Sequence, residues 1–147
     1  MVTQAIAGRS RWFSAACLGA VVLLGILSRR HPLPGFLAEY TGDALYSVAA
    51  FLALAWLAPR LSTRALVAAA FVGSASVEVS QLLAWPWLVE LRSRTLGALL
   101  LGQGFQWADF LAYGVGAACA GLVDLELAAA RSGDFSNPLA PGPPRSR

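Results

Sequence analysis

The sequence predicts an all-α, polytopic membrane protein with four transmembrane helices and two interfacial or re-entrant outer loops. Hydrophobic residues make up 57% of the 147 residues and charged residues only 13%, whereas an ordinary soluble domain has about 25% charged residues. Apolar stretches of roughly 17–25 residues, the length needed to cross a bilayer, can be placed about four times along the chain. We therefore expect one four-helix transmembrane domain over residues 1–131.

The four spans are expected at residues 12–28, 43–58, 65–85 and 107–125. The first has no small-residue cleavage site before the arginines that follow it, so it is interpreted as an uncleaved span and not as a signal peptide. Pro59 stops the second span and Pro86 closes the third, because a proline inside a helix removes a backbone hydrogen bond.

Two loops between the spans are predicted to lie in the membrane interface or to re-enter the membrane. Residues 31–40 contain Pro32 and Pro34, which forbid a straight helix. Residues 96–101 are too short to cross the bilayer and too apolar to lie in water. After the last span, residues 132–147 are rich in proline and poor in large apolar residues, which predicts a disordered cytoplasmic tail.

Arginine residues predict the orientation of the chain. With four spans, the side that holds both termini has seven of them: Arg9, Arg11, Arg60, Arg64, Arg131, Arg145 and Arg147. The opposite side has four: Arg29, Arg30, Arg92 and Arg94. Basic residues concentrate in cytoplasmic loops, so both termini are expected in the cytoplasm, in the inner membrane of a bacterium.

The most informative polar residue is Glu78, the only charged residue in the apolar stretch 65–89. A carboxylate inside a membrane span is costly, and it is usually retained by a partner or by a function. Ser74 and Gln81 lie four residues before it and three residues after it, which places all three on one face of a helix. The third span therefore carries a polar stripe into the outer half of the bilayer.

The same topology brings further polar residues to the outer end of the bundle. Asp43 opens the second span and Asp109 the fourth, where each carboxylate could also serve only as a helix cap. Glu78 could likewise form a purely structural salt bridge or hydrogen bond, and Arg92 is its first candidate counter-ion. The candidate ligand pocket comprises Glu78, Gln81, Arg92, Asp109, Asp43, Arg29 and Tyr113.

Other signals are weaker. Cys17 and Cys119 are interpreted as small apolar fillers, and His31 lacks metal-ligand spacing, so neither a metal nor a cofactor is expected. No catalytic triad can be assembled, which leaves the catalytic residues unknown and an enzymatic role uncertain and not favoured. An enzyme would use Glu78 or Asp109 as its general base. The chain has no basic stripe that would bind nucleic acid.

Small residues recur at four-residue spacing in the last span: Ala112, Gly116 and Ala120 form one ridge, and Ala117 and Gly121 another. Such ridges let helices approach closely. They indicate helix packing, either within one molecule or in a homo-oligomer.

Several of these residues occur together in the pattern of a known family. The matching positions are Ser28-Arg29-Arg30, Pro32, Pro34, Tyr40, Gly42-Asp43-Ala44-Leu45-Tyr46, Glu78, Gln81, Trp87, Leu91-Arg92, Leu101-Gly102, Gly104-Phe105, Trp107, Asp109, Tyr113 and Gly116. In their order and spacing they resemble the uncharacterised bacterial family called domain of unknown function (DUF) 2809. The order of Glu78, Arg92 and Asp109 more loosely resembles VanZ-like proteins, a family linked to teicoplanin resistance. VanZ-like chains commonly carry Lys and His near the position of Asp43, and this chain has neither there.

We expect an accessory protein of the bacterial cell envelope that lies in the lipid bilayer and binds a polar or amphipathic ligand, such as a lipid headgroup or a glycopeptide. The alternatives are an assembly subunit of a membrane complex and a component of a proton-coupled transporter. Residues 65–72, on the inner side of the third span, are wholly apolar. This counts against a transport path through one protomer.

Overall fold

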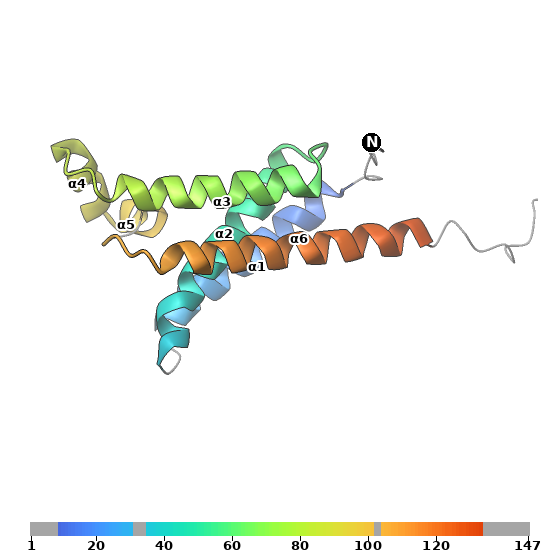
Figure 1. Ribbon diagram of the computed structural model, residues 1–147, viewed down its shortest axis with the longest axis horizontal. Helices are drawn as coiled ribbons and strands as arrows, with labels where there is room; N and C mark the ends of the chain where they lie inside the picture. Colours follow the sequence, from blue (N-terminus) through green and yellow to red (C-terminus); the bar gives the residue numbers. More distant parts are fainter. Residues whose placement is uncertain (1–8, 31–34, 102–103, 134–147) are drawn as a thin grey trace, which may run out of the picture.

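The computed structural model describes residues 9–30, 35–101 and 104–133, and six helices follow one another along them (Figure 1). They are α1 (Arg11–Arg30), α2 (Phe36–Leu57), α3 (Thr63–Ser80), α4 (Pro86–Ser93), α5 (Thr95–Leu101) and α6 (Asp109–Gly133). These residues contain no strand. The prediction of an all-α protein is therefore confirmed.

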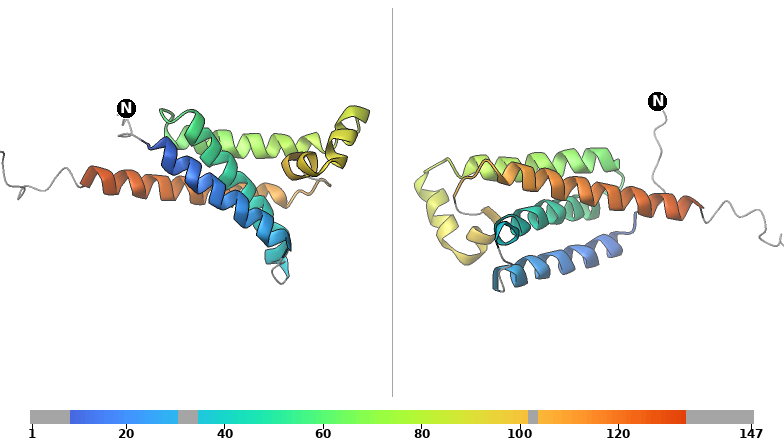
Figure 2. Two further views of the ribbon diagram at one scale, coloured as in Figure 1. Left: turned by 180° about the vertical axis from the view of Figure 1, so that it is seen from behind. Right: turned by 60° about the horizontal axis from the view of Figure 1, so that its bottom comes forward.

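The four long helices form two antiparallel pairs. α3 and α6 run side by side in opposite directions, and α1 and α2 form a second pair that crosses the first obliquely (Figures 1 and 2). α2 is the central element, because it packs against α1, α3 and α6. The short helices α4 and α5 pack on each other at the end of α3, where α6 begins.

Three helices are long and apolar enough to cross a membrane, with candidate spans at Arg11–Ser28, Tyr40–Leu57 and Asp109–Arg131. These spans agree with the first, second and fourth predicted spans and indicate a membrane protein. α3, which corresponds to the predicted third span, is not among them. Its sequence includes Arg64, Glu78 and several hydroxyl side chains, which lower its hydropathy.

Pro59 follows the end of α2 as predicted, but the predicted start of the second span and the predicted end of the third span are wrong. α2 begins at Phe36, directly after Gly35 with its positive φ of 62°, so Asp43 lies inside the helix and does not cap its N-terminus. α3 ends at Ser80, and Pro86 is the first residue of α4 instead of the end of the third span. Proline is well tolerated at the first position of a helix, where the backbone N–H has no helical partner.

α6 continues beyond the predicted end of the fourth span, up to Gly133. Two residues of the tail predicted for residues 132–147, 132 and 133, belong to α6, and the rest of the predicted tail lies outside the described residues. At the other end of the molecule, residues 96–101 belong to α5 and its hairpin with α4. The predicted outer loop there is helical.

A small apolar core lies where α2, α3 and α6 meet. It consists of Phe51 and Ala55 of α2, Leu66 and Ala70 of α3, and Ala117 of α6. Gly116 permits the close approach of α6 to α2, since a Cβ atom there would overlap the carbonyl oxygen of Ala44. Gly121 permits the close approach of α6 to α3, since a Cβ atom there would overlap the side chain of Val67. The small-residue ridges are therefore used for packing within the molecule.

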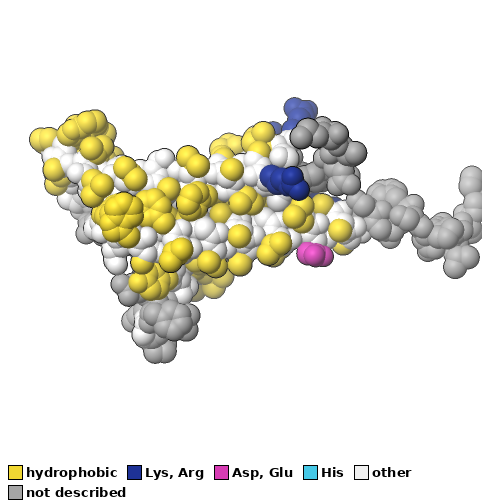
Figure 3. Space-filling model, in the orientation of Figure 1, with side chains coloured by type: hydrophobic (Ala, Val, Ile, Leu, Met, Phe, Trp, Pro, Cys, Tyr) yellow, Lys and Arg dark blue, Asp and Glu magenta, His cyan; other side chains and the backbone are white. Residues whose placement is uncertain are grey.

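The outer surface is apolar along most of its length. Hydrophobic side chains cover the face shown in Figure 3, and the arginine side chains visible on it gather at one end. Among the most exposed are Trp107 and Leu111 of the α6 region, Leu122 further along α6, and Leu57 of α2. Such a surface matches a helical protein surrounded by lipid.

Candidate functional site

The polar stripe of α3 faces the interior of the bundle. Leu66, Ala70, Ser74 and Glu78 follow one another at four-residue spacing, and all are buried. Helical side chains four positions apart lie on the same face, so the face that carries the apolar core continues directly into Ser74 and Glu78. Glu78 is only 1% exposed. The predicted polar stripe exists, and it contacts protein instead of lipid.

Both carboxylate oxygens of Glu78 accept hydrogen bonds. The backbone N–H of Gln106 donates to Oε1 at 2.7 Å, and the hydroxyl of Tyr113 donates to Oε2 at 3.0 Å. These bonds offset the cost of burying the carboxylate. Because Gln106 precedes α6 and Tyr113 lies one turn into it, Glu78 joins the end of α3 to the beginning of α6.

Two further side chains fasten α5 to the same end of the bundle. The Tyr46 hydroxyl donates to the carbonyl oxygen of Leu100 at 2.8 Å, and Nε2 of Gln81 donates to that of Leu101 at 3.0 Å. The rings of Tyr46 and Tyr113 are neighbours, with centroids 6.2 Å apart. The residues around Glu78 therefore hold the α5 end in place.

Arg92 is buried, and its guanidinium forms hydrogen bonds at the end of α3 and in the turn that follows it. Its guanidinium donates to the carbonyl oxygens of Ser80, at 2.5 Å, and Leu83, at 3.2 Å. A cation at a helix C-terminus interacts favourably with the last carbonyl groups and with the helix dipole. Arg92 thus caps α3.

The expected pairing of Arg92 with Glu78 is wrong. Between residues whose side chains the structure describes, the ion pairs are Arg9 with Asp124 and Arg94 with Glu90. Neutral and backbone donors take the place of the counter-ion that the sequence suggested for Glu78. A hydrogen-bonding tyrosine leaves no signature in the spacing of charged residues, so the charge pattern could not identify this partner.

Asp109 and Asp43 lie near the same cluster. Asp109 is the first residue of α6 and is buried, and an acidic residue is favoured there by the helix dipole. Asp43 is half-buried on α2. The charges of Asp43, Glu78 and Asp109 all act on the Tyr113 hydroxyl. Arg29, the remaining predicted pocket residue, lies in the last turn of α1, and its side chain is outside the described part of the structure.

An apolar groove with a volume of about 450 Å³ lies beside this cluster, between α2 and the beginning of α6. It is lined by Tyr40, Thr41, Ala44, Ala108, Leu111, Ala112 and Val115. Ala108 and Ala112 directly precede Asp109 and Tyr113 in the sequence, so the groove lies at the same end of the bundle as the polar residues, although no carboxylate lines it. An apolar groove next to a group of carboxylates suits an amphipathic molecule.

Two buried polar atoms of the α3 stripe have no hydrogen-bond partner among the described residues: Oγ of Ser74 and Oε1 of Gln81. Buried polar groups are normally paired. Oε1 of Gln81 can only accept a hydrogen bond, and Oγ of Ser74 can accept one or donate one. Together with the carboxylates, they make this end of the molecule rich in acceptors.

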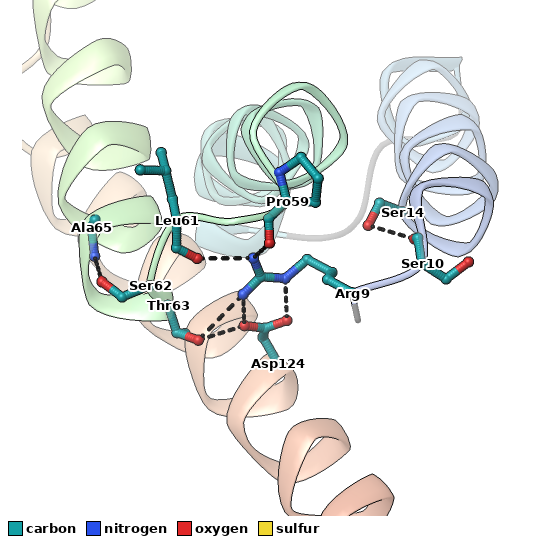
Figure 4. A network of polar contacts seen from close by, with 9 residues as sticks. All are labelled: Arg9, Ser10, Ser14, Pro59, Leu61, Ser62, Thr63, Ala65 and Asp124. Carbon is teal, nitrogen blue, oxygen red and sulfur yellow. Dashed lines mark hydrogen bonds and ion pairs between the residues drawn. The ribbon is translucent and has the colours of Figure 1, made fainter. Parts of the chain in front are cut away.

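A second polar network, at the opposite end, was not found from the sequence (Figure 4). Arg9 donates from Nε to Oδ1 of Asp124 at 2.9 Å and from Nη2 to Oδ2 at 2.5 Å, and Nη1 donates to the carbonyl oxygens of Pro59 and Leu61, each at 3.1 Å. Thr63 donates to the same carboxylate at 2.6 Å. In the sequence, Arg9 is only one of the arginines that indicate the cytoplasmic side. The signal that could have revealed the network is Asp124, an acid between apolar residues near the end of the last span.

The described residues contain no group of three His, Cys, Asp or Glu side chains that could hold a metal ion. Cys17 and Cys119 are both free thiols. His31 lies outside the described residues. Among the described residues, the region around Glu78 offers hydrogen-bond acceptors and an apolar groove.

The comparison with known protein families gives a match in the middle of the chain. No solved structure matches the chain. The sequence profile of the family described as "Protein of unknown function (DUF2809)" matches residues 32–117, a segment from the start of α2 to the first half of α6. It contains Asp43, Glu78, Gln81, Arg92, Asp109 and Tyr113. Because this segment is more than half of the chain, the protein belongs to the DUF2809 family.

Proposed function

We propose that this protein is a four-span accessory protein of a bacterial cell membrane that binds a lipid with a hydrogen-bond-donating headgroup. The observation that carries the proposal is the apolar groove at the end of the bundle that also holds the carboxylates of Glu78, Asp109 and Asp43. The groove would take an acyl chain, and the acceptor-rich end would take hydroxyl or amine groups of the headgroup.

The distribution of polar residues favours binding over transport. The network of Arg9 and Asp124 lies at one end of the bundle and the Glu78 cluster at the other. Between them lies the apolar core of α2, α3 and α6. A proton or ion path needs polar groups or water through the full thickness of the membrane. Among the residues that the structure describes, the buried charged side chains, Arg9, Glu78, Arg92 and Asp109, lie at the two ends of the bundle.

α3 is proposed as the fourth membrane span. Its 18 residues correspond to about 27 Å of helix, close to the roughly 30 Å of a bilayer core. Its buried residues Thr63 and Glu78 form hydrogen bonds with other parts of the protein. With α3 crossing, Arg9, Arg60, Arg64 and Arg131 share one end of the bundle, which the positive-inside rule assigns to the cytoplasm. The Glu78 cluster would then face outward, toward the cell envelope.

The test is native mass spectrometry of the protein purified in a mild detergent. The wild type should retain a lipid, whose headgroup the mass identifies. Ala108→Phe should fill the groove and reduce the retained lipid several-fold. Ala118→Phe is the matched control, because Ala118 lies on α6, which Ala108 directly precedes, is exposed and does not line the groove. Equal retention in wild type, Ala108→Phe and Ala118→Phe would contradict the proposal.

A glycopeptide is the second ligand class, and the VanZ-like order of Glu78, Arg92 and Asp109 is the feature that favours it. The same purified protein can be titrated with teicoplanin in place of lipid. Binding that Ala108→Phe weakens, in a preparation that retains no lipid, would replace the lipid by a glycopeptide as the ligand of this groove.

A further inference from the structure

A second cavity lies between α1 and α6, away from the groove beside Glu78. Both helices pack on α2, and in the described residues α1 and α6 make no helix–helix contact with each other (Figure 2). Residues of α2 line the cavity that lies between α1 and α6. The cavity between them has a volume of about 270 Å³. Phe13, Cys17, Leu52, Ala120 and Val123 are among the residues that line its apolar part.

The polar end of this cavity is positively charged. Arg9, Asp124 and Arg131 line it. The charges of Arg9 and Asp124 neutralise each other, because the two side chains form a bidentate ion pair that is 3% and 13% exposed. Arg131 is half-buried and adds a positive charge.

The surroundings of the cavity reinforce this charge. Arg11, Arg60 and Arg64 are exposed at the same end of the bundle, and the nearby exposed acid on α6 is Glu126. An excess of arginine next to an apolar cavity is complementary to a molecule with an anionic head and an apolar chain. Arginine binds phosphate through paired N–H donors, and basic residues near a membrane surface attract anionic lipids.

We infer that the cavity between α1 and α6 binds an anionic phospholipid, with one acyl chain along α2 and the phosphate at Arg131. A small soluble anion would gain nothing from the apolar walls that Phe13, Leu52 and Val123 provide. A lipid uses both parts of the cavity. This site is separate from the proposed headgroup site near Glu78, which is rich in acceptors and favours donors.

The experiment compares lipids of different charge on the full-length protein. Delipidated protein in detergent is titrated with phosphatidylglycerol, which is anionic, and with phosphatidylcholine, which is zwitterionic. Bound lipid is counted by native mass spectrometry. The wild type should bind phosphatidylglycerol more tightly. Arg131→Gln should weaken that binding about fivefold, the factor expected for one lost arginine–phosphate interaction, whereas Arg64→Gln, at an exposed position outside the cavity, should not.

Blocking the cavity provides an independent test. Val123→Trp should reduce phosphatidylglycerol binding, because Val123 lines the cavity and is 59% exposed, so that a larger side chain fits without disturbing the core. Leu122→Trp is the matched control on the next residue, which is 63% exposed and does not line the cavity.

Equal binding of the two lipids would overturn the inference, and so would equal losses in Arg131→Gln and Arg64→Gln, which would indicate a general charge effect. A protein dimer in the mass spectrum that Val123→Trp abolishes, without any bound phospholipid, would assign the cavity to a second copy of the chain. Each result concerns Arg131 and Val123, so failure of this inference leaves the Ala108 test of the other groove unaffected.

Discussion

The Tyr113 hydroxyl on α6 donates a hydrogen bond to Oε2 of Glu78 on α3 at 3.0 Å, and both groups are buried. The residues are 35 positions apart in the chain. Their contact joins the end of one long helix to the beginning of its antiparallel neighbour. It also accounts for a buried carboxylate without a direct arginine partner.

The Glu78–Tyr113 contact predicts a coupling between the two side chains. Tyr113→Phe leaves Oε2 of Glu78 without this donor and should destabilise the protein by about 1–3 kcal/mol, the cost of an unsatisfied buried polar group. Glu78→Gln should cost a similar amount, because an amide cannot accept at both positions. The double mutant should lose less than the sum of the two. Thermal unfolding of all four proteins in one detergent measures this.

The control for that cycle is Glu90→Gln, at an exposed glutamate whose ion pair with Arg94 lies on the surface of α4. Exposed pairs contribute about 0–1 kcal/mol, so its unfolding temperature should stay near that of the wild type. Strictly additive losses for Glu78→Gln and Tyr113→Phe would show that the two side chains are not coupled.

The ion pair of Arg9 and Asp124 predicts a larger effect. Removing one partner of a buried pair leaves the other charge unpaired and costs about 3–5 kcal/mol, so Arg9→Gln and Asp124→Asn should each strongly lower stability. Arg9 also holds the carbonyl groups of Pro59 and Leu61, so Arg9→Gln should be the more harmful. Limited proteolysis between α2 and α3 would detect the loosened loop. Cleavage there that is unchanged in Arg9→Gln would speak against this role.

The close contact between α2 and α6 is predicted to require glycine at position 116, because glycine has no side chain. A Cβ atom at this position would overlap the Ala44 carbonyl oxygen and the Ser47 hydroxyl, so Gly116→Ala should destabilise the protein by about 1–3 kcal/mol through overpacking. Gly73→Ala is the matched helical control, because no atom lies near the added methyl group. Removing glycine from a helix should there be neutral or stabilising by about 0.5–1 kcal/mol. Unfolding in detergent compares the two, and equal stability would refute the close contact.

The arginine distribution predicts the topology. Reporter fusions at Arg60 and after Arg131 should report cytoplasm, and fusions near His31 and Ser93 should report the outside, because arginine is enriched on the cytoplasmic side. This result also requires that α3 crosses the membrane. If Arg60 and Ser93 report the same side, α3 does not span it. If the tail reports the outside, the Glu78 cluster faces the cytoplasm and the envelope function fails.

Hydropathy and proline positions were sufficient for the membrane class and for three of the long helices. These properties are local, since a run of apolar residues crosses a bilayer whatever it packs against. The start of α2 and the end of α3 were less well predicted. Helix ends depend on capping contacts such as that of Arg92 with the Ser80 and Leu83 carbonyl groups, which come from residues beyond the helix.

By itself, the sequence determined that this is an apolar, helical protein and that Glu78, Gln81 and Asp109 come near one end of it, because alternating helix directions follow from span order. Only the tertiary structure decided which groups meet. Glu78 accepts hydrogen bonds from Tyr113 and Gln106 instead of pairing with Arg92. Arg9 pairs with Asp124, which lies 115 residues away in the sequence. Such pairings depend on helix rotation and crossing, which are set by the packing of small residues such as Gly116 against Ala44. A single sequence does not encode that geometry in any local pattern.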